Sequence, residues 1–146
     1  MAWGFGRVGY GPYRVGQMLE GAPHAKSTLQ RAATLLASGN AVGAYRVFGD
    51  RGVAALHGLG LAFGTKYLYF CSPAGGSGAL ILDRLAAVWL AKHAGVRLNQ
   101  VRWSSRTYAK YLSMMFGWAD ELKITGDAIE SVIFQHQAKL AGGQWG

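Results

Sequence analysis

The sequence predicts an all-α fold, a compact bundle of about seven short helices. Three observations support this prediction. Apolar residues recur at helical spacing, clusters of Gly, Pro, Ser or Asn separate the periodic stretches, and no stretch alternates with the period of a strand. The chain has 146 residues, of which 51% are hydrophobic. That length and composition are sufficient for one folded domain with an apolar core.

The first part of the chain divides into an arm and a helical region. Residues 1–24 are rich in Gly and aromatic residues and predict an irregular N-terminal arm, while residues 25–146 form the helical domain. The first helix begins at Ala25 and ends at the Ser-Gly-Asn sequence of residues 38–40. Asn40 then caps a short second helix.

Later elements are bounded by similar signals. A Gly/Pro loop, SPAGGSG, separates two apolar helices, Ser104 or Ser105 caps the next helix, and Asp127 caps the last one. On the last helix, 3–4 spacing predicts a core stripe of Ile129, Val132, Ile133, His136 and Leu140. The expected helices are approximately 25–37, 41–48, 51–57, 61–71, 80–94, 105–122 and 127–141.

The charge balance points to an anionic partner. Fifteen Lys and Arg residues face seven Asp and Glu residues, which gives a formal net charge of +8. A small domain this basic is typical of nucleic-acid binding, and less often of binding to a membrane surface or of charge kept for solubility. No helix pairs a lysine-rich face with a wholly apolar one, which disfavours the membrane surface. We therefore expect double-stranded DNA as the partner, a monomer, and no membrane.

Other classes of site and location are disfavoured by composition. The lone cysteine, Cys71, excludes an internal disulfide and a multi-cysteine metal site, and its apolar neighbours predict a buried side chain. The four histidines show no ligand spacing, so we expect no metal and no cofactor. The N-terminus lacks a signal-peptide pattern, and no apolar run is long enough to span a bilayer. These features predict a cytoplasmic, nucleoid-associated protein.

Two short helices joined by Gly58-Leu59-Gly60 predict a helix-hairpin-helix motif. Glycines allow the tight turn and a close approach to a DNA phosphate, and the N–H groups that begin the second helix point at that phosphate. The expected contacts to the DNA backbone are Gly58, Leu59, Gly60, Thr65, Arg51 and Arg106. A Gly-x-Gly sequence also joins many helices that bind nothing.

Basic and aromatic residues alternate near the start of the sixth predicted helix. Arg102, Arg106 and Lys110 are interleaved with aromatic residues, and together with Arg51 they could face the phosphates. The interleaved aromatic residues are Trp103, Tyr108 and Tyr111. The alternative is an ordinary solvated face.

Lys66 interrupts an otherwise apolar and aromatic stretch, GLGLAFGTKYLYF. Its apolar neighbours and the positive end of its helix both disfavour the ammonium form. A lysine whose amine is neutral near pH 7 is a nucleophile that can form a Schiff base. The alternative is a plain charge that reaches a phosphate.

Asp83 interrupts the next apolar run, ALILDRLAAVWLAK. It could cap the helix from Arg84 to Lys92, and a carboxylate fixed there stays ionised. Such a carboxylate could also stabilise positive charge on a sugar or assist proton transfer.

The order of these features resembles a known superfamily. A helix-hairpin-helix, a lysine on its second helix, a Gly/Pro loop and an aspartate resemble the helix-hairpin-helix, Gly/Pro-Asp DNA glycosylases. The lysine makes the chain similar to the bifunctional 8-oxoguanine glycosylases, especially the compact bacterial OGG-like branch. GLGLAFGTKYLYF and LILDRLAAVWL carry most of the match, which runs from Tyr45 to about Leu140. Residues 1–24 match loosely, through GYGPYR.

The resemblance implies catalytic roles for two residues. Lys66 matches the Schiff-base lysine, and Asp83 matches the essential aspartate. Many superfamily members place the lysine two residues after the last glycine of the hairpin, a position held here by Ala62. Ala62 and Lys66 are four residues apart and share a helix face. Alternatively, Gly64 ends the hairpin.

A possible base pocket lies on the last predicted helix, where Glu130 and Phe134 are one turn apart. The ring can stack on a flipped purine, while the carboxylate accepts two adjacent donors from a guanine-type edge. The resemblance supports this pair, because the 8-oxoguanine enzymes have a glutamine and a phenylalanine at this spacing. Alternatively, Phe134 packs on the arm and Glu130 is solvated.

The sequence thus predicts a DNA repair glycosylase with AP lyase activity. It would flip an oxidised purine, 8-oxoguanine, out of duplex DNA and form a Schiff base through Lys66, with Asp83 assisting base loss. The alternative is a non-catalytic helix-hairpin-helix module that binds DNA.

Overall fold

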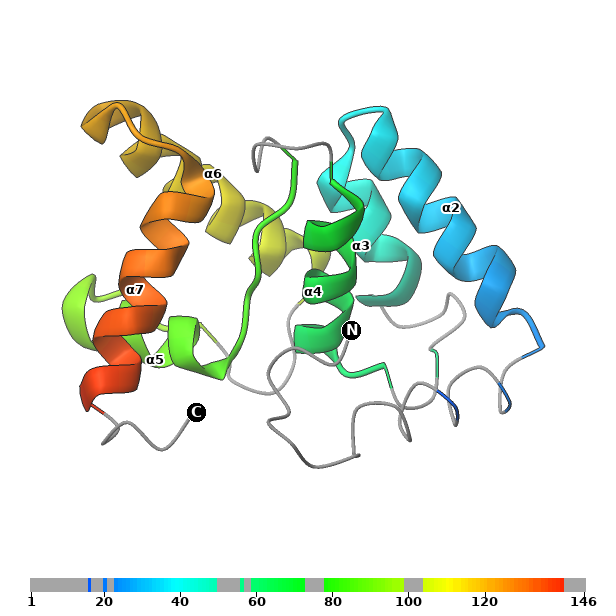
Figure 1. Ribbon diagram of the computed structural model, residues 1–146, viewed down its shortest axis with the longest axis horizontal. Coiled ribbons are helices and arrows are strands. Elements are labelled where there is room, and N and C mark those ends of the chain that lie inside the picture. The colour runs from blue at the N-terminus through cyan, green and yellow to red at the C-terminus, as the bar shows by residue number, and fades with distance from the viewer. Residues whose placement is uncertain are drawn as a thin grey trace.

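The computed structural model describes residues 16, 20, 23–49, 56, 59–72, 78–98 and 104–140. Over these residues the chain forms six α-helices and no strand, which confirms the all-α fold class. Of the predicted helix over residues 51–57, the structure describes only Leu56, which is not helical, so the hairpin stays a prediction. The helices are α2 (Ala25–Ala37), α3 (Ala41–Gly49), α4 (Leu61–Cys71), α5 (Arg84–His93), α6 (Ser105–Leu122) and α7 (Gly126–Leu140) (Figure 1).

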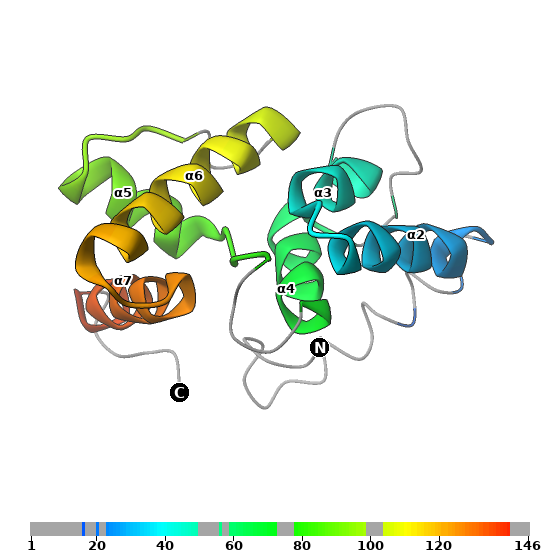
Figure 2. The same cartoon turned by 90° about the horizontal axis from the view of Figure 1, so that it is seen from above.

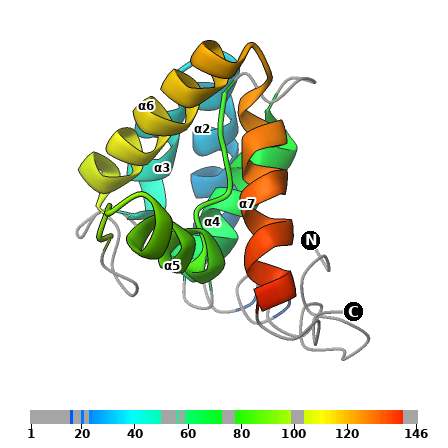
Figure 3. The same cartoon turned by 90° about the vertical axis from the view of Figure 1, so that its left-hand side faces the viewer.

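The helices form two groups (Figure 2). Helices α2, α3 and α4 pack against one another, while α7 packs against both α5 and α6. Contact between α3 and α6 joins the two groups. The extended segment of residues 79–83, which precedes α5, runs between α4 and α7 (Figures 1 and 3).

Side-chain caps fix the start of three helices. Asn40 accepts a hydrogen bond from the Gly43 N–H at 2.8 Å, and Ser104 accepts one from the Thr107 N–H at 3.2 Å. Asp83 does the same at α5. Each cap satisfies an N–H group that the helix itself leaves unpaired. The predicted caps Asn40, Asp83 and Ser104 are confirmed.

Two predicted helix starts are wrong. For α5 the start near Leu80 is wrong, because the residues before Asp83 are extended, whereas the alternative start at Arg84 with Asp83 as cap is confirmed. Helix α7 begins at Gly126, so Asp127 lies in its first turn instead of capping it.

The core differs from the predicted pattern at several positions. On α7, Ile129 and Ile133 are buried as predicted, but Gln137 is buried as well. Val132 and Leu140 are 63% and 59% exposed, and His136 is also exposed. The predicted stripe was too wide, because α7 packs against α5 and α6 along a narrow face.

Cys71 also departs from its predicted burial. It lies at the C-terminal end of α4 and is exposed. Apolar neighbours in the sequence do not share its face of the helix, since residues adjacent in sequence point in different directions.

Tyrosines of α6 hold the extended segment. Tyr108 donates a hydrogen bond to the Leu80 carbonyl at 2.8 Å, and Tyr111 donates one to the Ile81 carbonyl at 2.9 Å. Both tyrosines are fully buried, and burial raises the pKa of each phenol well above its usual value. The phenols therefore stay protonated and remain donors. These aromatic residues belong to the core and do not form a DNA-facing surface.

Thr65 of α4 holds the same segment from the other side. Its hydroxyl accepts a hydrogen bond from the Leu82 N–H at 3.1 Å and lies 3.1 Å from the Leu82 carbonyl. The hydroxyl oxygen also lies 3.0 Å from the Ala62 carbonyl oxygen, so the hydroxyl can donate its one proton to either carbonyl. The Thr65 side chain is fully buried, which argues against its predicted contact with a DNA phosphate.

Replacing Tyr111 by Phe tests how strongly the fold depends on these contacts. Tyr111→Phe leaves the buried Ile81 carbonyl without its donor, so we expect a loss of about 1–3 kcal/mol of unfolding free energy. Chemical denaturation measures this loss. Tyr69→Phe is the matched control, because the Tyr69 hydroxyl has no hydrogen-bond partner among the described residues. Equal stability of the two variants would contradict the assigned role.

Candidate functional site

A cavity of about 710 Å³ opens between α4, the start of α5 and α7. Three elements that are distant in the sequence contribute its walls, which combine aromatic rings with carboxyl groups. The side chains that define its chemistry are Tyr69, Phe70, Asp83, Asp127, Glu130 and Phe134. A cavity of this size is sufficient for a small ligand such as a nucleobase.

Asp83 reaches the cavity from the cap position of α5. Its backbone is extended, and its Oδ1 accepts a hydrogen bond from the Ala86 N–H at 3.0 Å. A carboxylate at a helix N-terminus is stabilised by the aligned peptide dipoles. The Asp83 side chain therefore caps α5 and also forms part of the cavity wall.

Glu130 lies in the wall of the cavity in an environment that disfavours its charge. Its pKa is raised from 4.5 to about 8, chiefly because burial removes the carboxyl from water. A hydrogen bond from the Ile81 backbone opposes this shift, Asp83 and Asp127 add to it by repulsion, and the attraction of Lys66 lowers the pKa. Glu130 therefore changes its charge close to neutral pH.

Lys66 lies beside the cavity and is not one of its lining residues. Its Nζ is 5.5 Å from the centre of the Phe63 ring, and its charge is close enough to Glu130 to lower the pKa of that carboxyl. Tyr69 and Phe70 follow three and four residues later on the same side of α4, and both line the cavity. The structure thus brings Asp83, Glu130 and Phe134 into one cavity, with Lys66 at its α4 side.

The N-terminus of α4 has no side-chain cap. Gly60 holds the cap position in an extended conformation that any residue can adopt, and it is exposed. A Cβ atom added there would meet one atom of Phe63 at an ordinary 3.9 Å. Neither space nor backbone conformation in the protein requires glycine at this position. Leu59 is half-buried and packs against the core.

The predicted alternative in which Gly64 ends the hairpin does not agree with the structure. Gly64 lies inside α4 and is buried, and a Cβ atom there would overlap the ring of Phe48. Its lack of a side chain is required by packing between α3 and α4.

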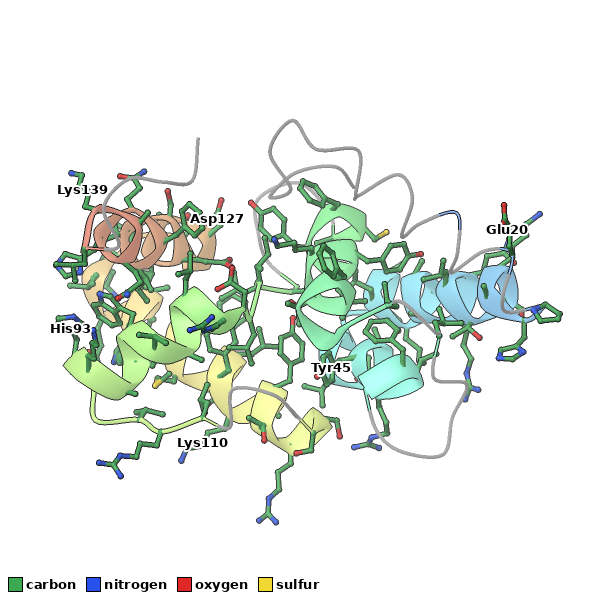
Figure 4. The ribbon with its side chains drawn as sticks, turned by 90° about the horizontal axis from the view of Figure 1, so that it is seen from below. Glu20, Tyr45, His93, Lys110, Asp127 and Lys139 are labelled. Carbon is green, nitrogen blue, oxygen red and sulfur yellow. The ribbon has the colours of Figure 1, made fainter. Side chains whose placement is uncertain are left out.

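The predicted basic surface is not part of the cavity. Arg106 is exposed on the first turn of α6 and does not line it. Lys110, four residues later, projects from the opposite edge of the molecule to Asp127 in Figure 4. Gly58, Arg51, Arg102 and Trp103 lie outside the described residues.

Comparison with known proteins identifies the family. A family model described as "Putative 8-oxoguanine DNA glycosylase OGG-like protein" matches residues 1–134, which include most of α7. The chain belongs to this family. No curated protein and no solved structure matches the chain. The resemblance to the OGG-like branch is thereby confirmed, and an OGG-like glycosylase family indicates DNA as the partner.

Two further findings concern the described part of the chain. None of its helices is both long and apolar enough to cross a membrane. Its His, Cys, Asp and Glu side chains also form no group of three or more that could hold a metal ion.

Of the six side chains that define the chemistry of the cavity, sequence reasoning missed three: Tyr69, Phe70 and Asp127. Helical spacing could have indicated each of them. Tyr69 and Phe70 lie one turn after Lys66, and Asp127 lies one turn before Glu130. The missing information was which face of each helix points to the cavity.

The raised pKa of Glu130 predicts a pH-dependent effect on stability. Because the folded-state pKa of about 8 exceeds the unfolded value of 4.5, folding favours the protonated form. The contribution of protonated Glu130 to the free energy of unfolding is complete below about pH 4.5 and is lost as the pH rises through 8. We expect Glu130→Gln, which is neutral throughout, to be more stable than the wild type above pH 8 by about 1–3 kcal/mol.

Denaturation of both proteins between pH 5 and 9 measures this difference. Glu121→Gln serves as the control, because Glu121 is exposed on α6. A stability difference between Glu130→Gln and wild type that stays constant across this range would contradict the raised pKa.

Proposed function

We propose that the protein excises an oxidised purine, 8-oxoguanine, from duplex DNA and then cleaves the strand through Lys66. The observation that carries this proposal is the single cavity shared by Asp83, Glu130 and Phe134, with Lys66 on the adjoining helix. Membership of the OGG-like family supports it. We propose that a monomer acts on damaged DNA, at the nucleoid in the cytoplasm.

In the proposed reaction, Lys66 is the nucleophile. Its neutral amine forms a bond to C1′ of the flipped nucleotide while the bond from C1′ to N9 breaks. The electron pair leaves with the base, which takes up a proton. The attached amine loses a proton and the sugar ring opens, which leaves a Schiff base. Loss of a proton from C2′ then breaks the bond from C3′ to oxygen and nicks the strand.

Asp83 is proposed to act through its charge. Positive charge develops on the sugar as the base departs, and a carboxylate fixed by its cap hydrogen bond can stabilise it without moving. The negative charge of Asp83 is therefore already in place beside the sugar before the base leaves.

Glu130 and Phe134 are proposed to hold the flipped base. They line the cavity from adjacent turns of α7, so that the ring of Phe134 can stack on the purine while Glu130 contacts its edge. A guanine-type edge presents two adjacent donors, which fit the carboxylate form. Binding such an edge therefore releases the proton that Glu130 holds near neutral pH.

The start of α4 is proposed to bind the DNA backbone. Its uncapped N-terminus is exposed at Gly60, and free N–H groups at a helix N-terminus bind phosphate. Leu59 and Gly60 belong to this contact, together with Gly58 and Arg51 of the predicted hairpin. Arg106 is proposed as a more distant phosphate contact.

Borohydride trapping tests the covalent step. We expect the wild-type protein to form a covalent adduct with a duplex that contains 8-oxoguanine, because borohydride reduces a Schiff base to a stable amine. Lys66→Gln has no amine and should give no adduct. Gel electrophoresis of the trapped complex measures the outcome.

Lys139→Gln is the matched control, because Lys139 is exposed near the C-terminal end of α7 and points outward (Figure 4). It should trap as the wild type does. An adduct that survives Lys66→Gln would refute the role of Lys66. Salt-sensitive binding of DNA without any adduct would instead support a non-catalytic DNA-binding module.

Replacing Gly60 by Ala tests the backbone contact. A Cβ atom at this position fits the folded protein, so we expect stability to change by less than about 1 kcal/mol. The same Cβ obstructs a phosphate at the N-terminus of α4, and DNA binding should weaken by about 0.5–1.5 kcal/mol, the net value of one hydrogen bond.

Affinity for duplex DNA, measured at one fixed salt concentration, checks this expectation. Gly117→Ala is the control, because Gly117 is exposed on α6 with nothing near its Cβ position. If Gly60→Ala binds duplex DNA as tightly as the wild type does, the N-terminus of α4 is not part of the DNA-binding surface.

A further inference from the structure

Asp127 is a cavity residue for which the proposed mechanism has no role. It lies in the first turn of α7 and lines the cavity with Glu130 and Phe134. Its Oδ1 is shielded from water and has no hydrogen-bond partner among the described residues. A shielded carboxylate oxygen without a donor is unfavourable, so a ligand that brings a donor recovers this free energy.

The position of Asp127 suits contact with a base that Glu130 already holds. The two residues are three apart on α7, and neighbours at this spacing lie about 5–6 Å apart between their Cβ atoms. Figure 4 shows Asp127 at the edge of α7 that faces α4, the helix that forms the opposite wall of the cavity. Rotation about the Cβ–Cγ bond of an aspartate is broad, so either oxygen can turn to the cavity.

The chemistry of the oxidised base requires an acceptor besides Glu130. Guanine and 8-oxoguanine present the same donors on their Watson–Crick edge, so a carboxylate at that edge cannot distinguish them. Oxidation converts N7 from an acceptor into an N–H donor and adds an oxygen at C8. A site that selects the oxidised base therefore needs an acceptor opposite N7.

We propose that Asp127 is the specificity-determining residue of the cavity and accepts a hydrogen bond from the N7–H of the oxidised purine. This inference rests on the proposed function. In this arrangement α7 faces the O6 side of the base, with Glu130 at N1–H and N2–H and Asp127 at N7–H, while Phe134 stacks on the ring.

The same carboxylate rejects the undamaged base. The N7 of guanine carries a lone pair, and placing it against a carboxylate oxygen brings two acceptors together. The cavity would thus discriminate in two ways: a hydrogen bond increases its affinity for the oxidised base, and acceptor–acceptor repulsion lowers its affinity for guanine. Buried polar groups left unpaired by the wrong substrate are an effective source of selectivity.

A substrate change combined with a protein change tests the contact. The duplexes carry 8-oxoguanine or 8-methoxyguanine, which retains the C8 oxygen but has no N7–H. A 2′-fluoro sugar prevents cleavage, so the affinity of the wild-type protein can be measured directly. We expect the wild type to bind 8-oxoguanine about tenfold more tightly or better, and Asp127→Ala to reduce this ratio to within about twofold of one.

Ser131→Ala is the matched control, because Ser131 lines the same cavity, is exposed, and its Oγ accepts a hydrogen bond from Gln135. It should keep the wild-type ratio. Asp127→Asn serves if Asp127→Ala does not fold. Its amide offers a donor as well as an acceptor to N7, so the ratio should fall there too.

An unchanged ratio in a folded Asp127 variant would overturn the inference, as would a wild type that does not prefer 8-oxoguanine over 8-methoxyguanine. The proposed function fails separately. It fails if the wild type gives no borohydride adduct with 8-oxoguanine duplex, whatever the binding ratios are.

Discussion

The structure depends on hydrogen bonds that side chains make to one buried extended segment, residues 79–83. A buried peptide group needs a partner inside the protein, and the described residues include no strand that could supply one. Hydroxyl groups of Thr65, Tyr108 and Tyr111 provide the partners instead. Because these residues come from α4 and α6, the segment ties the two groups of helices together.

The same requirement positions the carboxyl groups of the cavity. At the end of the segment, Asp83 becomes the cap of α5, and the backbone of Ile81 hydrogen-bonds to Glu130. This contact helps to hold the Glu130 carboxyl in a buried position near Asp83. Burial, and to a lesser extent repulsion from Asp83, raises the pKa of Glu130. Altering the hydroxyl groups that hold the segment should therefore affect the site as well as the stability of the fold.

Local sequence signals were sufficient for much of the fold but not for its contacts. Asn40 and Ser104 marked helix starts because capping depends on a few neighbouring residues. The start of α5 was misplaced because Leu80 and its neighbours suit a helix by composition, and their extended form depends on distant donors such as Thr65. For the same reason, the sequence pattern placed Tyr108 beside basic residues on a possible phosphate-facing surface, and only tertiary packing shows that it belongs to the core.

The sequence indicated several residues of the candidate site, but it did not indicate that acidic side chains would gather in the cavity of a basic protein. Three of the chain's seven acidic residues line one cavity, although the protein carries a net charge of +8. In the proposed function, the net positive charge of the protein attracts the DNA backbone, whereas carboxylates in the cavity would repel phosphate and accept hydrogen bonds from a flipped base. The same carboxylates would stabilise the positive charge that the sugar acquires as its base departs. Because burial raises the pKa of Glu130 to about 8, this carboxyl is protonated at neutral pH, which limits its repulsion with Asp83 and Asp127. In the proposed function, Glu130 would lose this proton when the flipped base offers its donors.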